Sequence, residues 1–482
     1  MNSSLILLVL IGYFIMLLVV SYLSGRKATD NEAFFTARHS SPWWVVAIGM
    51  VGASVSGVSF VSVPGMVGGI QFSYMQTVLG FFVGYLIIAN VLLPLYYRLQ
   101  LTSIYTYLGQ RFGSRSYTTG ASFFLLSKTL GAAARLYVVA LILQTMVFDA
   151  WNVPFWITIT VILLMIWLYT YRSGIKSIVW TDTLQTVVML TALLIMVGKL
   201  MEMNGLNTGD FLSQMYADSK SRVFVWDDWI SKQHFVKQFF SGIFIAVVMT
   251  GLDQDMMQKN LTCRNLKDAK KNMYWYGMAF IPFNLLFLML GWLMLTFAQT
   301  NGIQLPAGGD QLLPFFAENY FGTAVMLMFV TGIIAAAFSS ADSALAALTT
   351  SFMVDILKIG PKDQRKNIRI GVHAGISLLF VLIVLIIRQL NERSIIDTIY
   401  VLVSYTYGPL LGMFSFGLFT RLRPSDHWVP WLAIASPLLC LAINELTVHY
   451  TSYAFGYELL LMNGLFMFIG LYISSKYGNK KG

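Results

Sequence analysis

The chain has 482 residues, of which 57% are hydrophobic and only 11% are charged, and this composition predicts a polytopic membrane protein. The formal net charge of +10 does not indicate nucleic-acid binding, because the basic residues lie in short connections beside apolar runs, where they determine topology. The two cysteines lie in different environments and predict no disulfide, and the widely spaced histidines exclude a transition-metal motif.

A bilayer span needs about 20 consecutive apolar residues. The sequence contains thirteen such runs and leaves no segment for a soluble domain. We therefore predict an all-α protein with thirteen transmembrane helices, folded as a single transmembrane domain over residues 1–482. Its expected surrounding is the lipid bilayer, and we expect a monomer.

The first run, residues 3–23, is too long for a signal-peptide core and is followed by the basic pair Arg26-Lys27. It predicts a retained helix whose N-terminus lies outside. Alternate connections are basic, which predicts a cytoplasmic C-terminus in a multi-pass protein of the cell (inner or plasma) membrane. The connections assigned to the cytoplasm include Arg98, Arg111, Lys176, Lys259, Lys271 and Arg421. The longest polar connection, residues 201–233, is predominantly acidic and falls outside.

Two of the apolar runs are interrupted by small residues. Residues 43–70 contain seven glycine or proline interruptions together with Ser54, Ser56 and Ser59, and residues 235–258 contain Gly242 and Gly251. A broken helix exposes carbonyls that lipid cannot satisfy, so it is tolerated where it lines a cavity or an ion site. Because these runs lie five crossings apart, they predict a 5+5 inverted repeat with two discontinuous helices and the site between them.

Ionisable side chains within the runs are candidates for function. Lys128 and Arg135 lie in the run at residues 119–148, where Lys128 can snorkel toward the membrane surface and Arg135 cannot easily do so. Arg135 either pairs with an acid of the protein or binds an anionic substrate. Asp182, in the run at residues 177–200, can cap locally, pair with Arg135 or bind a cation.

The run at residues 322–354 carries an oxygen-rich stripe. Ala336, Ser339, Ser340 and Ser343 share one helical face, and Asp342 borders it. Such residues suit either close helix packing or a sodium ion, which prefers oxygen ligands. The ionisable Asp342 favours a functional role.

The last three runs predict one kinked helix and two helices at the periphery of the bundle. Tyr407-Gly408-Pro409, in the run at residues 395–420, predicts a kink. The runs at residues 428–448 and 454–475 are typical of peripheral helices. Since the sequence has neither a nucleotide-binding glycine loop nor a hydrolase triad, we expect no enzyme.

Several of these segments resemble the sodium:solute symporter family. They are Val179-Trp180-Thr181-Asp182-Thr183-Leu184-Gln185, Asp253-Gln254 with Gln258-Lys259, Ala336 to Ser343 with Asp355-Ile356, and Tyr407-Gly408-Pro409 with Gly417-Leu418-Phe419. The chain departs from the family at Ser173-Gly174, where a Gly-Gly pair is common. The resemblance implies a LeuT-type fold with an extra N-terminal helix (3–23), a ten-helix inverted-repeat core (43–420) and two peripheral helices (428–475).

The resemblance also implies a first sodium site. Its ligands are the carbonyls of Gly52, Val55 and Ala336 and the hydroxyls of Ser339 and Ser340. The residues agree with this assignment, because Gly52 and Val55 flank the expected break where carbonyls come free.

Bacterial sialic-acid symporters of this family use a second sodium ion near the acid that corresponds to Asp182. The matching set here is Asp182, Ser339, Asp342 and Ser343, with Asp342 standing where those transporters have a serine. One sodium beside two carboxylates leaves a negative charge, so this set predicts either a second sodium or a proton.

For the substrate, the same transporters look similar at six positions: Ser54, Ser56, Ser59, Phe72, Gln76 and Arg135. Arginine favours a carboxylated solute, with sialic acid as one candidate, and a neutral sugar as the alternative. The resulting hypothesis is a sodium-coupled symporter that imports a small organic solute by alternating access. A channel and a transporter-like sensor are the alternative classes.

Overall fold

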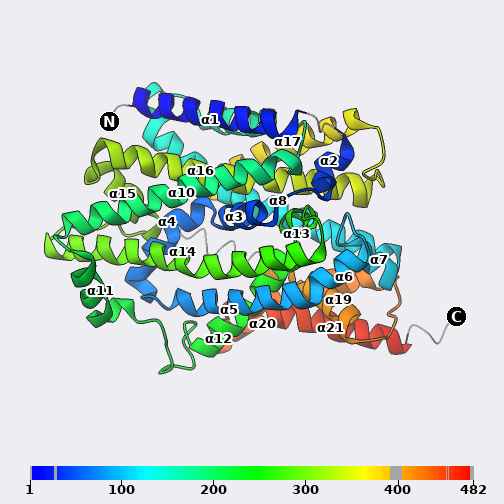
Figure 1. Ribbon diagram of the computed structural model, residues 1–482. Helices are drawn as coiled ribbons and strands as arrows, with labels where there is room; N and C mark the ends of the chain where they lie inside the picture. The colour runs from blue at the N-terminus through cyan, green and yellow to red at the C-terminus, as the bar shows by residue number, and fades with distance from the viewer. Residues whose placement is uncertain (1–2, 27–29, 391–403, 452, 454, 478–482) are drawn as a thin grey trace.

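The computed structural model describes residues 3–26, 30–390, 404–451, 453 and 455–477. Figure 1 shows a bundle of long helices that run side by side, with the N-terminus at one end and the C-terminus at the other. We call these the N-terminal end and the C-terminal end of the bundle. Termini at opposite ends agree with an odd number of crossings. Helix α11 and its flanking connection, which belong to the predicted polar segment 201–233, lie at the N-terminal end.

The described residues contain 9 helices that are long and apolar enough to cross a membrane. They are α1 (Ser3–Gly25), α5 (Tyr74–Ile87) continued by α6 (Leu93–Arg98), α8 (Ser114–Leu143), α10 (Ile175–Met203), α14 (Leu266–Thr300), α16 (Gly322–Ser351), α17 (Lys366–Leu390), α20 (Val429–Tyr450) and α21 (Leu459–Tyr477). Two shorter apolar helices, α9 (Phe155–Thr170) and α19 (Gly408–Phe419), accompany them.

Two further spans are bent, as predicted. The first bent pair joins α3 (Trp43–Ser54) to α4 (Gly57–Ile70) at 61°. The second bent pair joins α12 (Phe235–Ala246), through the π-turn Val247–Gly251, to α13 (Gln254–Leu261) at 63°. Counting each pair as one span gives up to 11 spans, so the all-α polytopic prediction is confirmed and the count of thirteen stays a prediction. Part of the run predicted at 395–420 lies outside the described residues.

Glycine allows each bent pair to approach a neighbouring helix closely. A Cβ atom added at Gly52 would lie 2.1 Å from the Thr186 hydroxyl of α10, and one added at Gly242 would lie 2.3 Å from the Thr77 carbonyl of α5. These distances are far below van der Waals contact, so both positions require glycine. The first contact brings the break of the first bent pair next to Asp182.

Short helices complete the ends of the bundle: α2 (Asn31–Thr36), α7 (Thr106–Arg111), α11 (Thr208–Ala217) and α15 (Leu312–Asn319). The predicted interruption near Tyr407-Gly408-Pro409 coincides with the start of α19, which has Pro409 in its first turn. Proline is favoured there because it has no backbone N–H to leave unpaired.

Candidate functional site

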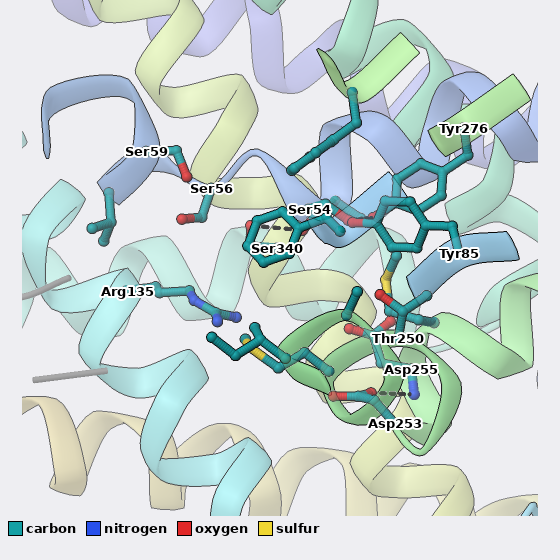
Figure 2. Close-up of a pocket in the computed structure, with 18 of the residues that line it drawn as sticks. Ser54, Ser56, Ser59, Tyr85, Arg135, Thr250, Asp253, Asp255, Tyr276 and Ser340 are labelled. Atoms are coloured by element: carbon teal, nitrogen blue, oxygen red, sulfur yellow. Dashed lines mark hydrogen bonds between the residues drawn. The ribbon is translucent and has the colours of Figure 1, made fainter. Parts of the chain in front are cut away.

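A cavity lies between the two bent pairs, and its two walls differ in character (Figure 2). One wall is aromatic and consists of Phe81, Tyr85, Tyr276 and Phe280. The other is polar and consists of Ser54, Ser56, Ser59, Lys128, Arg135, Thr250, Asp253, Asp255 and Ser340. A cavity with one apolar wall and a few convergent polar groups is typical of a small-molecule site.

Four of the six predicted substrate residues line this cavity: Ser54, Ser56, Ser59 and Arg135. Ser54 lies 2.7 Å from the hydroxyl of Tyr276, which donates to the Tyr85 hydroxyl at 3.0 Å. This chain of hydroxyl groups connects the first bent pair to the aromatic wall.

The other two predicted substrate residues, Phe72 and Gln76, are not among the residues that line this cavity, and their role in solute binding stays a prediction. The Gln76 side chain accepts from the backbone N–H of Val225 at 3.0 Å and donates to the carbonyl of Gln233 at 2.9 Å. The N–H of Phe72 donates to the Arg222 carbonyl at 3.1 Å. Both residues therefore form hydrogen bonds with the polar connection at the N-terminal end of the bundle. They can do so because Phe72 lies just before α5 and Gln76 lies in its first turn.

The break of the first bent pair leaves backbone carbonyls open. The N–H of Ser56 donates to the Ser54 carbonyl at 3.1 Å instead of continuing the helix to Gly52. Within the described part of the chain, no hydrogen bond reaches the carbonyls of Gly52 and Val55. Open carbonyls beside a cavity are suitable ligands for a hard cation.

Helix α16 contacts this break through the hydroxyl of Ser340, one of the predicted sodium ligands. The Ser340 hydroxyl donates to the Ala336 carbonyl at 3.1 Å and to the Ala53 carbonyl of α3 at 3.4 Å. The second bond is long, so the hydroxyl can turn toward an ion at little cost. The structure thus places Ala336 and Ser340 beside the break that carries Gly52 and Val55.

The residues predicted for a second cation also come together, and all are buried. Asp182 accepts from the Ser339 hydroxyl at 2.6 Å and from the Ser343 hydroxyl at 3.2 Å. Asp342 accepts from Tyr169 at 2.8 Å and lies 3.2 Å from the same Ser343 hydroxyl. Ser343 therefore connects the two carboxylates.

Lys259 also belongs to this cluster, although the sequence suggested a basic connection at that position. Its ammonium lies 2.8 Å from Asp182 and 3.9 Å from Asp255, and its side chain is only 1% exposed. Asp182 is thus paired with Lys259 and not with Arg135. A clue in the sequence was the i, i+4 spacing of Asp255 and Lys259. In the structure, both residues belong to an eight-residue helix of which every residue is buried.

Lys128 is also buried, so the expectation that it snorkels is wrong. Its ammonium lies 3.1 Å from Asp253 and 2.7 Å from Asp255, and the Tyr407 hydroxyl donates to Asp253 at 2.7 Å. Sequence reasoning missed this ion cluster because its members come from three separate helices.

Arg135 differs from the two lysines. It lies two helical turns beyond Lys128 on the same face of α8, and Figure 2 shows its side chain pointing into the cavity. It forms no ion pair with any acid in the described residues. The cavity therefore contains a guanidinium group available for an anion.

Comparisons with known proteins identify the family to which this chain belongs. The sequence pattern described as "Sodium:solute symporter family" matches residues 34–423. The chain is 25% identical over 431 residues to the sodium/sialic acid symporter SiaT of Proteus mirabilis, covering 86% of this chain and 84% of that protein. It is also 25% identical over 420 residues to the human sodium-coupled monocarboxylate transporter 2, covering 82% of this chain and 64% of that protein.

Among solved structures, the fold is similar to that of a sodium-coupled sialic acid symporter in a substrate-bound outward-open state. The TM-score is 0.82 at 20% identity, with 98% of this chain and 97% of the other covered. That likeness supports the fold, and the family match spans most of the sequence. The chain therefore belongs to the sodium:solute symporter family, whose members are multi-pass membrane transporters and not enzymes.

Proposed function

We propose that this sodium-coupled symporter imports a small carboxylated solute, whose carboxylate binds Arg135. The observation that carries the proposal is the guanidinium of Arg135, which lies in the cavity and forms no ion pair with any acid among the described residues. The neighbouring acids contact other cations: Asp253 and Asp255 share Lys128, and Asp182 contacts Lys259. Because none of these acids forms a direct ion pair with Arg135, its guanidinium group can bind an anion from solution as a direct partner.

The aromatic wall narrows the class of solute. Tyr85, Tyr276 and Phe280 offer apolar surface in the same cavity as the serines and Arg135, so the site suits a carboxylate attached to a ring or a short apolar body. Sialic acid and small monocarboxylates both satisfy this requirement, and relatives named for both match this chain. A neutral sugar would leave the guanidinium of Arg135 without a partner.

Sodium is proposed to bind at the break of the first bent pair. The carbonyls of Gly52, Val55 and Ala336 and the hydroxyls of Ser339 and Ser340 would be its ligands. Ser54 and Ser56 of the cavity lie within the same break. Sodium binding would therefore order the backbone that presents these hydroxyls to the solute, which couples the two binding free energies.

Binding measurements can test the solute class. Thermal unfolding of the purified protein, followed with carboxylated solutes and with their methyl esters, should shift only with the free acids, because a ligand that binds the folded state stabilises it by mass action. Arg135→Lys keeps the charge and loses the bidentate fork, so the solute concentration for half-maximal shift should rise about tenfold or more. Arg264→Lys, in an exposed connection, is the matched control. Equal shifts by acid and ester would refute the carboxylate.

Sodium-coupled transport can be measured with the purified protein in proteoliposomes. With an inward sodium gradient and no pH gradient, the solute found in the screen should accumulate, and replacement of sodium by potassium or choline should abolish accumulation. Equal uptake in all three salts would refute sodium coupling through the proposed site.

We further infer that the C-terminal end of the bundle faces the cytoplasm. Helix α7, which ends with Arg111, lies at this end, as does α2, which is followed by Arg38 (Figure 1); these basic residues support the positive-inside assignment. Single cysteines introduced at Lys267 and at Thr208 should be labelled from opposite sides of sealed, inverted vesicles. Labelling of both from one side would contradict this orientation.

A further inference from the structure

Lys259 lies within the cluster that the sequence assigns to a second cation. We propose that the ammonium group of Lys259 is itself the cation of the Asp182 site, so that this symporter binds one sodium ion rather than two. This inference rests on the proposed function, in which sodium binds at the first bent pair, and it adds the number of sodium ions that each chain binds.

The first argument is occupancy. One oxygen of Asp182 accepts the Ser339 hydroxyl at 2.6 Å, and the other accepts Ser343 at 3.2 Å and lies 2.8 Å from the Lys259 ammonium. The Asp182 side chain is fully buried and that of Lys259 is 1% exposed. A sodium ion bound to Asp182 would therefore have to displace a buried ammonium from its carboxylate, which is strongly unfavourable.

The second argument is charge. Asp182 and Asp342 with Lys259 carry one net negative charge when all three are ionised. A single sodium ion at the first bent pair, whose ligand set shares Ser339 with this cluster, balances that charge. Before a solute carboxylate enters the cavity, a second sodium would leave an excess positive charge in a low-dielectric region, and such a charge is costly.

The third argument is attachment. Lys259 belongs to α13, and the Gln258 side chain next to it donates to Thr350 of α16 at 2.9 Å and to the Phe35 carbonyl at 2.7 Å. A tethered ammonium competes with free sodium at a high effective concentration. Because this ammonium is attached to α13, a movement of α13 relative to α10 would separate it from Asp182, so this cation can respond to conformation rather than to the sodium gradient.

Equilibrium binding of radioactive sodium to the purified full-length protein tests the proposal. The wild type should bind one sodium per chain with a Hill coefficient near one. Lys259→Gln removes the tethered cation and should gain a second saturable sodium, with a Hill coefficient that rises toward two. Lys259→Arg retains a cation and should keep one sodium, and Lys267→Gln, at an exposed position, is the matched control.

Two saturable sodium ions in the wild type would overturn the inference, and this result needs no variant to fold. A Lys259→Gln protein that still binds solute and only one sodium would also overturn it. Failure of the proposed function has a different signature, because the wild type would then show no saturable sodium binding at all.

Discussion

The two bent pairs have almost the same shape and opposite chemistry. They bend by 61° and 63° and face each other across the cavity. The first pair, residues 43–70, contains no charged side chain, whereas the second, residues 235–261, carries Asp253, Asp255 and Lys259 at its bend and inner helix. Equal geometry therefore does not imply an equal role.

The difference extends to the backbone. At the second break, the hydroxyl of Tyr96 donates to the Gly251 carbonyl at 2.8 Å and that of Tyr105 donates to the Leu252 carbonyl at 2.9 Å. At the first break, the carbonyls of Gly52 and Val55 receive no comparable donor from the described residues. Broken helices in membranes must satisfy their free carbonyls. In the second pair, tyrosine hydroxyl groups of this chain satisfy the free carbonyls. In the first pair, the carbonyls of Gly52 and Val55 remain available as ligands for an added ion.

The largest effect should follow from removing Lys128 of α8, the cation that pairs with the two acids of the second pair. Lys128→Met leaves Asp253 and Asp255 buried without this partner, which should lower the free energy of unfolding by roughly 3–5 kcal/mol. Thermal unfolding in detergent measures the loss. Lys199→Met, which removes an exposed pair with Glu202, should stay near the wild type. Equal stability of the two variants would show that the second pair does not depend on its own charges.

A methyl group at the first break should weaken sodium binding strongly. Gly52→Ala places a Cβ 2.1 Å from the Thr186 hydroxyl, so either this hydroxyl must turn away from its carbonyl partners or α3 must move away from α10. Overpacking of this kind costs about 1–3 kcal/mol, and if about 1.4 kcal/mol of that cost falls on sodium binding, the sodium concentration for half-maximal uptake rises about tenfold. Gly69→Ala, where the added atom meets nothing within 4 Å, is the control. An unchanged sodium dependence in Gly52→Ala would place the ion elsewhere.

Loss of a single ligand oxygen should have a smaller effect. Ser340→Ala removes a hydroxyl beside the first break and should raise the half-maximal sodium concentration about fivefold, as expected for roughly 1 kcal/mol. Ser241→Ala, at a buried serine of the second bent pair that has no hydrogen-bond partner in the described structure, should leave it unchanged. If both alanine variants shift the sodium dependence alike, the contrast between the two pairs is wrong.

The smallest effect is expected at the capped carbonyls. Tyr96→Phe leaves the Gly251 carbonyl without its donor and should lower the free energy of unfolding by about 1 kcal/mol. The midpoint of a sodium titration should not move. A shifted midpoint would mean that the second break also contributes to the sodium site.

The sequence predicted the bent pairs because their signal is local. Glycine and serine within an apolar run weaken a helix wherever it lies, and both interruptions occur where they were expected. The oxygen-rich stripe of α16 was also readable, because Ser339, Ser340 and Ser343 repeat with the helical period.

The charge pairing was not predictable in the same way. Lys259 pairs with Asp182 of α10, and Lys128 pairs with acids of the second break, so each pair joins helices that are distant in sequence. The aromatic wall gave no signal, since Tyr85 and Phe280 look like ordinary membrane-helix residues. Gln76 was assigned by resemblance, and in this structure it binds the polar connection at the N-terminal end.

A sodium titration of thermal stability tests the central claim most directly, namely that the open carbonyls of the first bent pair hold the transported ion. Sodium should raise the unfolding temperature of the wild type, and potassium at equal ionic strength should not. Ser340→Ala should shift the sodium midpoint upward, while Tyr96→Phe should lower stability at every sodium concentration without moving that midpoint. Equal stabilisation by potassium, or equal midpoint shifts in the two variants, would contradict the account.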